Sequence, residues 1–270
     1  MLRTRIVTGL ILGALLLLGL FLLPPLWAVG AFGLVFALAA WEWAGFGALA
    51  APAARAAYTA LMVVILWASW MFTAQTSHLI LMLAAACGWW LIALLWLSLA
   101  PQRHQPLLVL LCGVPVLVPA FAALARLVAS EEGLARGPQI VLWLVLMVCA
   151  ADIGAYFAGR RFGRRKLAPR VSPGKTWEGA LGGLILVCTV ACAGAVYFSL
   201  PIHLAAAFGC GVGIFSIIGD LTESMFKRAA ALKDSGTILP GHGGLLDRLD
   251  SVTAAAPLYA LGLFGSGVIP

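Results

Sequence analysis

Long, nearly uncharged apolar runs restrict what this chain can fold into more than any other feature of its sequence. Between polar or Pro/Gly breaks the runs are about 17 to 25 residues long, the length of helix that crosses the roughly 30 Å hydrocarbon core of a bilayer. A transmembrane β-barrel would instead show alternating segments of about ten residues. The sequence therefore predicts an all-α protein that crosses a membrane several times.

The composition agrees with this prediction. Hydrophobic residues make up 63% of the 270 residues, charged residues make up 10%, and the mean hydropathy is +1.05. These values lie outside the range of water-soluble domains. All 6 cysteines lie inside apolar runs, so the sequence predicts neither a disulfide framework nor a zinc site.

We predict about nine transmembrane helices with a cytoplasmic N-terminus. The first run follows Arg3 and Arg5 and has no clear small-residue cleavage site, so we expect it to remain as an uncleaved anchor. With this orientation, 15 of the 17 lysines and arginines fall in cytoplasmic segments, as the positive-inside rule requires. The expected spans lie near 6–22, 26–49, 57–74, 78–98, 107–127, 138–158, 179–199, 203–220 and 252–269.

The first polar segment runs from Asp152, near the end of a predicted span, to Ser172-Pro-Gly-Lys175-Thr176. The Ser-Pro pair is typical of a turn, and we expect a helix to begin there whose N–H groups, with Lys175 and the hydroxyls of Ser172 and Thr176, bind an anion such as phosphate. A P-loop is excluded because Pro169 stands where its first glycine would be. The positive-inside bias accounts for the arginines Arg160, Arg161, Arg164 and Arg165.

The second polar segment combines acids, bases and glycines. Its first part recurs at helical spacing and predicts one polar helix face made of Asp220, Glu223, Ser224, Lys227 and Arg228. The glycines of Pro240-Gly-His-Gly-Gly244 permit a close approach to a ligand, and Asp247 and Asp250 then share a helix face. Carboxylates beside cations suit Mg²⁺ bound to a triphosphate, so the pattern favours metal-assisted phosphoryl or nucleotidyl transfer.

These motifs together resemble a known family. The run Ser224-Met-Phe-Lys-Arg228, then Lys233-Asp234, then Pro240-Gly-His-Gly-Gly-Leu-Leu-Asp-Arg-Leu-Asp250 is similar to the signature of the phosphatidate cytidylyltransferase (CDP-diacylglycerol synthase) family. The upstream blocks Asp152-x-x-Ala-Tyr-x-x-Gly-Arg160 and Ser172-Pro-x-Lys-Thr-x-Glu-Gly179 resemble the same family. The resemblance divides the chain into a hydrophobic multi-span region, 1–137, and a catalytic membrane region, 138–270, with cytoplasmic loops 159–178 and 221–251.

The resemblance implies a phospholipid-biosynthetic enzyme of the bacterial inner (plasma) membrane. It would transfer CMP from CTP to phosphatidic acid at the cytoplasmic face, giving CDP-diacylglycerol and pyrophosphate. Mg²⁺ would be the cofactor, with a second, monovalent ion at the site. Family members are homodimers among membrane lipids, and no nucleic acid is expected as a partner.

Carried onto this chain, the resemblance also implies roles for individual residues. Asp220 and Asp247 would bind the metal, and Asp152 and Asp250 would support them. Ser172, Lys175 and Thr176 would hold the nucleotide phosphates. The phosphate or pyrophosphate environment would contain Lys227, Arg228 and His242, and substrate contacts would also come from Lys233, Asp234 and Arg248.

Several alternatives stay open at this point. A membrane kinase of polyprenol or phytol, or a cytidylyltransferase of archaeal ether lipids, would carry similar chemistry, and an acceptor assay separates them. A CDP-alcohol phosphotransferase is disfavoured because its Asp-Gly-x2-Ala-Arg motif is missing. A transporter would place its ionisable groups near the bilayer midplane in two internal repeats, and no repeat is apparent. His242 could simply pack in a turn, and Glu42 could be a helix–helix hydrogen bonder or a cavity residue.

Overall fold

The computed structural model describes residues 2–100, 105–130 and 137–266. Over these residues the chain is helical apart from one β hairpin and its loops, so the predicted all-α class is confirmed. The elements are α1 (Leu2–Phe21), α2 (Pro25–Phe46), α3 (Pro52–Phe72), α4 (Thr76–Leu99), α5 (Pro106–Val128), α6 (Gly137–Phe162), β1 (Lys166–Ala168), β2 (Ser172–Thr176), α7 (Trp177–Phe198), α8 (Ile202–Ala229), the 3-10 helix η1 (Leu246–Arg248) and α9 (Asp250–Gly265).

Seven of these helices, α2 to α8, are long and apolar enough to cross a membrane. The apolar part of α1, Ile6–Phe21, is shorter, and α9 has 16 residues. A multi-span helical protein is therefore confirmed, whereas the number nine and the cytoplasmic N-terminus stay predictions. Some boundaries differ from those expected: α3 begins at Pro52, a residue type favoured in the first helical turn, so Arg55 lies in the helix and not in a loop.

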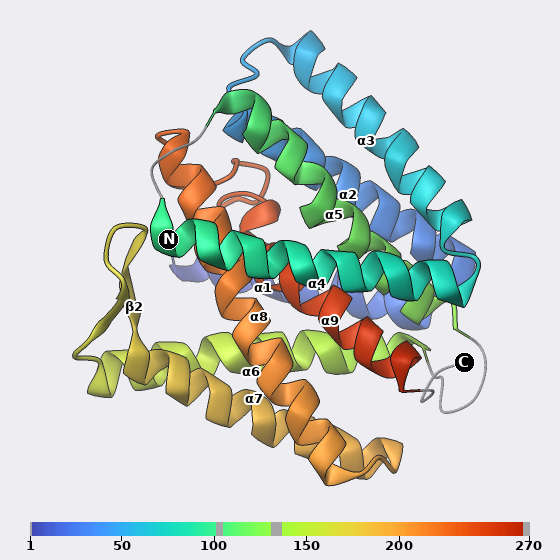
Figure 1. Ribbon diagram of the computed structural model, residues 1–270, viewed down its shortest axis with the longest axis vertical. Coiled ribbons are helices and arrows are strands. Elements are labelled where there is room, and N and C mark those ends of the chain that lie inside the picture. The colour runs from blue at the N-terminus through green and yellow to red at the C-terminus, as the bar shows by residue number, and fades with distance from the viewer. Residues whose placement is uncertain (1, 101–104, 131–136, 267–270) are drawn as a thin grey trace.

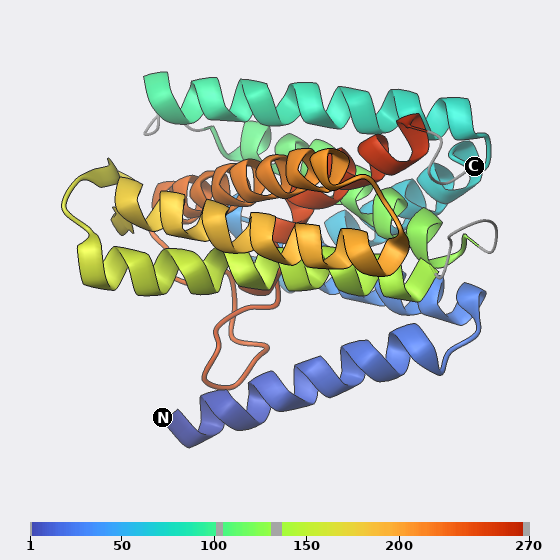
Figure 2. The same cartoon turned by 90° about the horizontal axis from the view of Figure 1, so that it is seen from below.

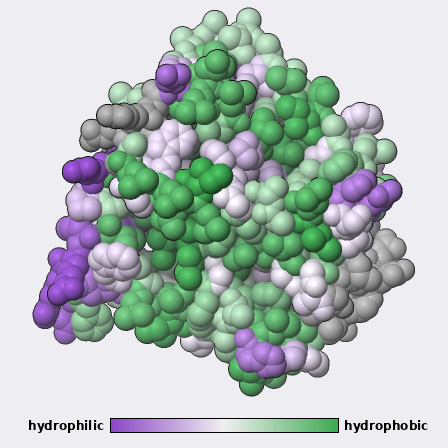
Figure 3. Space-filling model, viewed as in Figure 1, coloured by the Kyte–Doolittle hydropathy of each residue, from purple (hydrophilic) through white to green (hydrophobic). Residues whose placement is uncertain are grey.

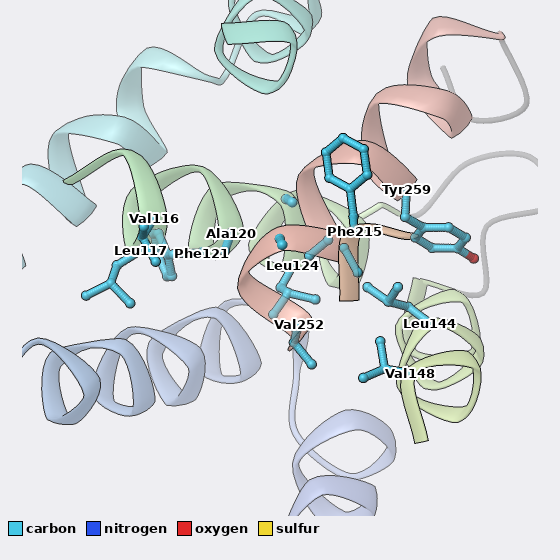
Figure 4. Packing of buried hydrophobic residues seen from close by; sticks show 14 of the residues in the cluster. Val116, Leu117, Ala120, Phe121, Leu124, Leu144, Val148, Phe215, Val252 and Tyr259 are labelled. Atoms are coloured by element: carbon cyan, nitrogen blue, oxygen red, sulfur yellow. The ribbon is translucent and has the colours of Figure 1, made fainter. Parts of the chain in front are cut away.

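Helices α5 and α9 form the interior of the bundle. Figures 1 and 2 show α9 inside the bundle beneath α4, and it packs against α4, α5 and α8. In Figure 4, Leu124 of α5, Phe215 of α8 and Val252 and Tyr259 of α9 converge with Leu144 of α6. Because lipid tails are as apolar as these side chains, close van der Waals packing is the main stabilising interaction among the helices.

Helices α6 and α7 form the closest pair in the bundle. A Cβ atom added at Gly154 of α6, or at Gly182 or Gly183 of α7, would collide with the facing helix. Small residues at such an interface let two helix backbones approach closely. The polar hairpin that joins α6 to α7 is therefore fixed against the ends of both helices.

The hairpin corrects one prediction. Strand β2 pairs antiparallel with β1, with Ser172 opposite Ala168, so no helix begins at Ser172 and Pro173. The strand pairing uses backbone N–H and C=O groups of residues that we had expected in the first turn of a helix. Helix α7 begins directly after Thr176, whose Oγ1 accepts a hydrogen bond from the N–H of Gly179 at 3.1 Å. Thr176 is thus the N-cap of α7.

Helix α1 lies to one side of the bundle (Figure 2). Its inward face carries Thr8, Leu12, Leu16 and Leu20 at intervals of four residues. The other large apolar side chains described between Ile6 and Phe21 are exposed, as Leu10 is at 69%. This pattern is typical of a helix with most of its surface in lipid.

Candidate active site

A cavity of about 400 Å³ opens where α6, β2, α7 and α8 meet. Its charged lining residues are Asp152 and Arg160 of α6, Lys175 of β2 and Asp220 of α8, and the rest of its wall is mostly Ala, Gly and Leu. Figure 3 shows hydrophilic residues gathered at the edge of the molecule where Figure 1 places the hairpin. The charged residues therefore run along the cavity: Lys175 and Arg160 lie toward the hairpin, and Asp152 lies near the level of Gly183, between the helices.

An ion pair joins two predicted site residues across this cavity. Lys175 Nζ contacts Asp220 Oδ2, and Ser224 Oγ donates a hydrogen bond to Asp220 Oδ1 at 3.3 Å. The side chains of Lys175 and Asp220 are 27% and 26% exposed. Ion pairs that solvent can reach contribute only about 0–1 kcal/mol, so an incoming anion can separate this pair at little cost.

One face of α6 continues the charged lining. Asp152, Tyr156 and Arg160 follow one another at intervals of four, and all three line the cavity. Asp152 lies near enough to Asp220 to repel it electrostatically. Arg160 Nη1 donates to the Tyr156 hydroxyl at 2.9 Å, and Arg160 forms no ion pair with any residue that the structure describes. We had assigned this arginine to membrane topology alone, although its spacing from Asp152 was a signal for the site.

A second, more buried ion cluster follows along α8. Lys227 Nζ lies 3.1 Å from Glu223 Oε1 and 2.6 Å from Asp247 Oδ1. The side chains are 10%, 4% and 6% exposed for Lys227, Glu223 and Asp247 respectively. Asp220, Glu223 and Lys227 are three and four residues apart, so the two clusters share one face of the helix, as the sequence predicted.

Asp247 is held in place by several donors. Its Oδ2 accepts hydrogen bonds from the backbone N–H groups of Ser235 at 2.9 Å and Gly244 at 2.8 Å, while Oδ1 contacts Lys227. Burial raises the pKa of Asp247, but these bonds outweigh burial and hold its pKa below the ordinary value. The carboxylate is therefore ionised at neutral pH.

The glycine-rich loop places His242 away from the cavity. Gly241 and Gly243 have φ values of 77° and 86°, which L residues rarely adopt. The His242 ring lies against α1, with Cε1 3.9 Å from where a Cβ of Gly9 would be, and Thr8 Oγ1 donates to the Pro240 carbonyl at 2.9 Å. His242 is not among the described residues that line the cavity. Its predicted contact with phosphate stays a prediction.

Glu42 of α2 is a residue whose role the sequence left open. Its carboxylate is buried, with 2% of the residue exposed. It accepts hydrogen bonds from Ser235 Oγ at 2.9 Å and from the N–H groups of Leu245 and Leu246 at 3.0 and 2.8 Å. Glu42 therefore forms hydrogen bonds to residues on both sides of the glycine-rich loop, including Leu246 of η1, which agrees with the interpretation as a buried hydrogen bonder, and it is not among the described residues that line the cavity.

Asp250, like Asp247, is not among the described residues that line the cavity, but it lies close to one that is. It begins α9, and its carbonyl lies so close to Gly219 that a Cβ there would collide with it. The carboxylates of Asp250 and Asp220 interact electrostatically. Other predicted residues lie elsewhere: the exposed Arg228 bonds to the Leu232 carbonyl near the end of α8. The described lining of the cavity does not include Ser172, Lys233, Asp234 or Arg248.

The charges of the site fit a hard divalent cation. Asp152 and Asp220 line the cavity with Lys175 and Arg160, and Glu223 and Asp247 flank Lys227 in the second cluster, so carboxylate oxygens and cations lie close together in both places. Among the described residues no three acid, His or Cys side chains form a ready-made metal cage. Mg²⁺ that arrives with a nucleotide needs only one or two carboxylates plus phosphate oxygens and water. The residues present fit such an ion.

The fold is that of a multi-pass membrane protein, and the cavity among its helices carries both carboxylates and basic side chains. A family model described as "Cytidylyltransferase family" matches residues 3–264. The phosphatidate cytidylyltransferase of Haemophilus influenzae is 39% identical over 96% of this chain and 98% of its own length. That of Pseudomonas aeruginosa is 41% identical over 99% and 98%. The chain belongs to the cytidylyltransferase family, and the resemblance seen in its motifs is confirmed.

Proposed function

We propose that this enzyme transfers CMP from CTP to phosphatidic acid and releases CDP-diacylglycerol and pyrophosphate. A phosphate oxygen of the lipid forms a bond to the α-phosphorus of CTP. The bond from that phosphorus to the bridging oxygen breaks, and pyrophosphate leaves with the electron pair. The observation that carries the proposal is the cavity, because charged side chains among apolar walls between helices suit a nucleotide and a lipid that must meet. The two full-length relatives support the same acceptor.

The basic residues of the cavity bind the anionic groups in this proposal. The phosphomonoester of the lipid is already a nucleophile, so the protein needs to supply position and charge neutralisation more than a strong base. Lys175 turns from Asp220 to the nucleotide phosphates when CTP enters. Arg160, oriented by Tyr156 at the cavity wall, binds the lipid phosphate through its planar guanidinium.

Asp220 and Asp247 are the proposed ligands of Mg²⁺. When bound, Mg²⁺ would neutralise charge on the leaving pyrophosphate and align the reacting groups. Ser224 orients Asp220, and Lys227 with two backbone N–H groups orients Asp247. A second, monovalent ion follows only from the family resemblance.

We place the site at the cytoplasmic face of the bacterial inner membrane, where CTP is available and where the positive-inside rule puts the basic hairpin. A cysteine introduced at the exposed Lys166 should react with an impermeant thiol reagent in inverted vesicles and not in intact spheroplasts. The family resemblance also implies a homodimer, which chemical cross-linking in membranes tests.

The decisive experiment measures transfer of labelled CMP from CTP to phosphatidate by purified enzyme, with and without Mg²⁺. We expect Asp220→Asn and Asp247→Asn to lose most activity and Lys166→Met, an exposed control in β1, to keep it. If both aspartate variants keep normal turnover, the metal assignment is wrong. If the wild type ignores phosphatidate but consumes CTP with a polyprenol, a lipid kinase replaces the proposed activity.

A further inference from the structure

Glu42 is a buried acid whose charge is balanced by hydrogen bonds. It forms no ion pair with any residue that the structure describes, and three donors from one distant segment face its two oxygens. Burying a carboxylate is costly unless donors replace its water. The arrangement therefore requires the donors to stay in place, and it fixes the segment that carries them.

Two of the donors belong to the start of η1. The N–H groups of Leu245 and Leu246 stand at the beginning of this short helix, where backbone donors lack partners within the helix. The carboxylate of Glu42 supplies their acceptor from α2. Since Asp247 is the next residue along η1, its backbone position follows from theirs.

Ser235 connects Glu42 to Asp247 directly. Its hydroxyl donates to Glu42 Oε2 at 2.9 Å and accepts from the N–H of Asp247 at 3.2 Å, while its own N–H donates to Asp247 Oδ2. The other oxygen of Asp247 contacts Lys227. A continuous set of hydrogen bonds thus runs from α2 to the buried ion cluster of α8.

The glycines of the segment fit closely around the same carboxylate. A Cβ added at Gly236 or at Gly244 would collide with the carboxylate of Glu42, and at Gly244 it would also collide with the Ser235 hydroxyl. The main chain at Gly236 and at Gly244 therefore packs directly on Glu42. This packing is independent of the hydrogen bonds and indicates the same fixed arrangement.

We propose that Glu42 is a positioning residue: it holds residues 235–247 so that the Asp247 carboxylate stays beside Lys227 in the geometry that the reaction needs. The proposal rests on the proposed function for its kinetic consequence. It assigns to the N-terminal multi-span region a direct part in the geometry of the catalytic region.

The test compares Glu42→Gln with the wild type and with Arg55→Gln. The amide of Gln has nearly the volume of the carboxylate but keeps one acceptor oxygen, so at least one donor loses its partner. Arg55, whose Nε donates to the Leu49 carbonyl just beyond the end of α2, touches the same region without reaching the loop. We expect Glu42→Gln to remain folded, to lose about tenfold to a hundredfold in kcat and to need more Mg²⁺ for half-maximal rate, as removal of a residue that orients a metal ligand does. Arg55→Gln should keep both values.

Unchanged kcat and Mg²⁺ response in folded Glu42→Gln would overturn the proposal. Ser235→Ala gives a second test, because it removes the connecting hydroxyl without altering α2. We expect its loss of activity to be non-additive with that of Glu42→Gln in the double variant. Independent, multiplying losses would show that Glu42 does not act through Ser235.

Limited proteolysis with trypsin tests this proposal independently of the proposed function. Lys233 is exposed and lies two residues before Ser235. If the substitution releases residues 235–247, trypsin should cleave faster after Lys233, and mass spectrometry of the fragments measures the rate. If the wild type shows no CMP transfer, the proposed function fails. Faster cleavage in Glu42→Gln still supports the positioning role, and equal cleavage rates in variant and wild type overturn it.

Discussion

Replacing Lys227 by Met tests whether the buried ion cluster stabilises the fold. The substitution keeps the length of the side chain but leaves Glu223 and Asp247, 4% and 6% exposed, without their shared cation. Removing one partner of a buried pair typically costs about 3–5 kcal/mol, because the remaining charge stays buried. We expect the thermal unfolding midpoint of Lys227→Met in detergent to fall by roughly 6–20 °C. The exposed control Lys166→Met should change the free energy of unfolding by no more than about 0.5 kcal/mol.

The charge itself can be distinguished from the loss of packing by a second substitution. Adding Glu223→Gln to Lys227→Met removes one of the two buried acids that have lost their shared cation, so part of the lost stability should return. A Lys227→Met enzyme that unfolds within about 2 °C of the wild type would refute the reasoning, since less than about 1 kcal/mol would then depend on the ion cluster.

Two further predictions concern residues around this cluster. The pKa of Asp247 lies below its ordinary value of about 3.9, so its contribution to stability is present above about pH 5 and is lost as pH falls through the lowered pKa. Asp247→Asn lacks this contribution. Its unfolding temperature should therefore drop less than that of the wild type between about pH 6 and pH 3. Gly244→Ala should lower the free energy of unfolding by about 1–3 kcal/mol, because its methyl group would collide with Ser235 and Glu42. Gly174→Ala, which has open space around it, should leave this free energy unchanged. Equal unfolding temperatures for the two variants would contradict the packing argument.

Features that depend on local spacing could be predicted from the sequence. The lengths of the apolar runs gave the helical class because one physical dimension, the thickness of the bilayer, sets the length of a span. The periodicity of Asp220, Glu223 and Lys227 placed them on one face of α8, where the structure has them. The same reasoning could have included Arg160, which continues the face of Asp152 and Tyr156.

Features that depend on contacts between distant segments could not be read from spacing. The sequence does not show that Ser172 would pair with Ala168 in a strand, because both strand and helix begin with such turn residues. It also does not show that Lys175 would pair with Asp220, on the next helix but one along the chain. The partners of Glu42 were beyond any local pattern, since they follow it by about 200 residues.

That separation has a consequence for biosynthesis. Glu42 emerges from the ribosome before its partners, because the backbone groups that bond to it are 203 and 204 residues further along the chain. At about 5–20 residues per second, the acid waits on the order of 10–40 s for its partners. An unsatisfied carboxylate in hydrocarbon is unfavourable by a few kcal/mol, so we expect the nascent α2 to keep this side chain near water or protonated until residues 235–246 have been made. The segment that carries Asp247 thus docks on an acid that was synthesised about 200 residues earlier.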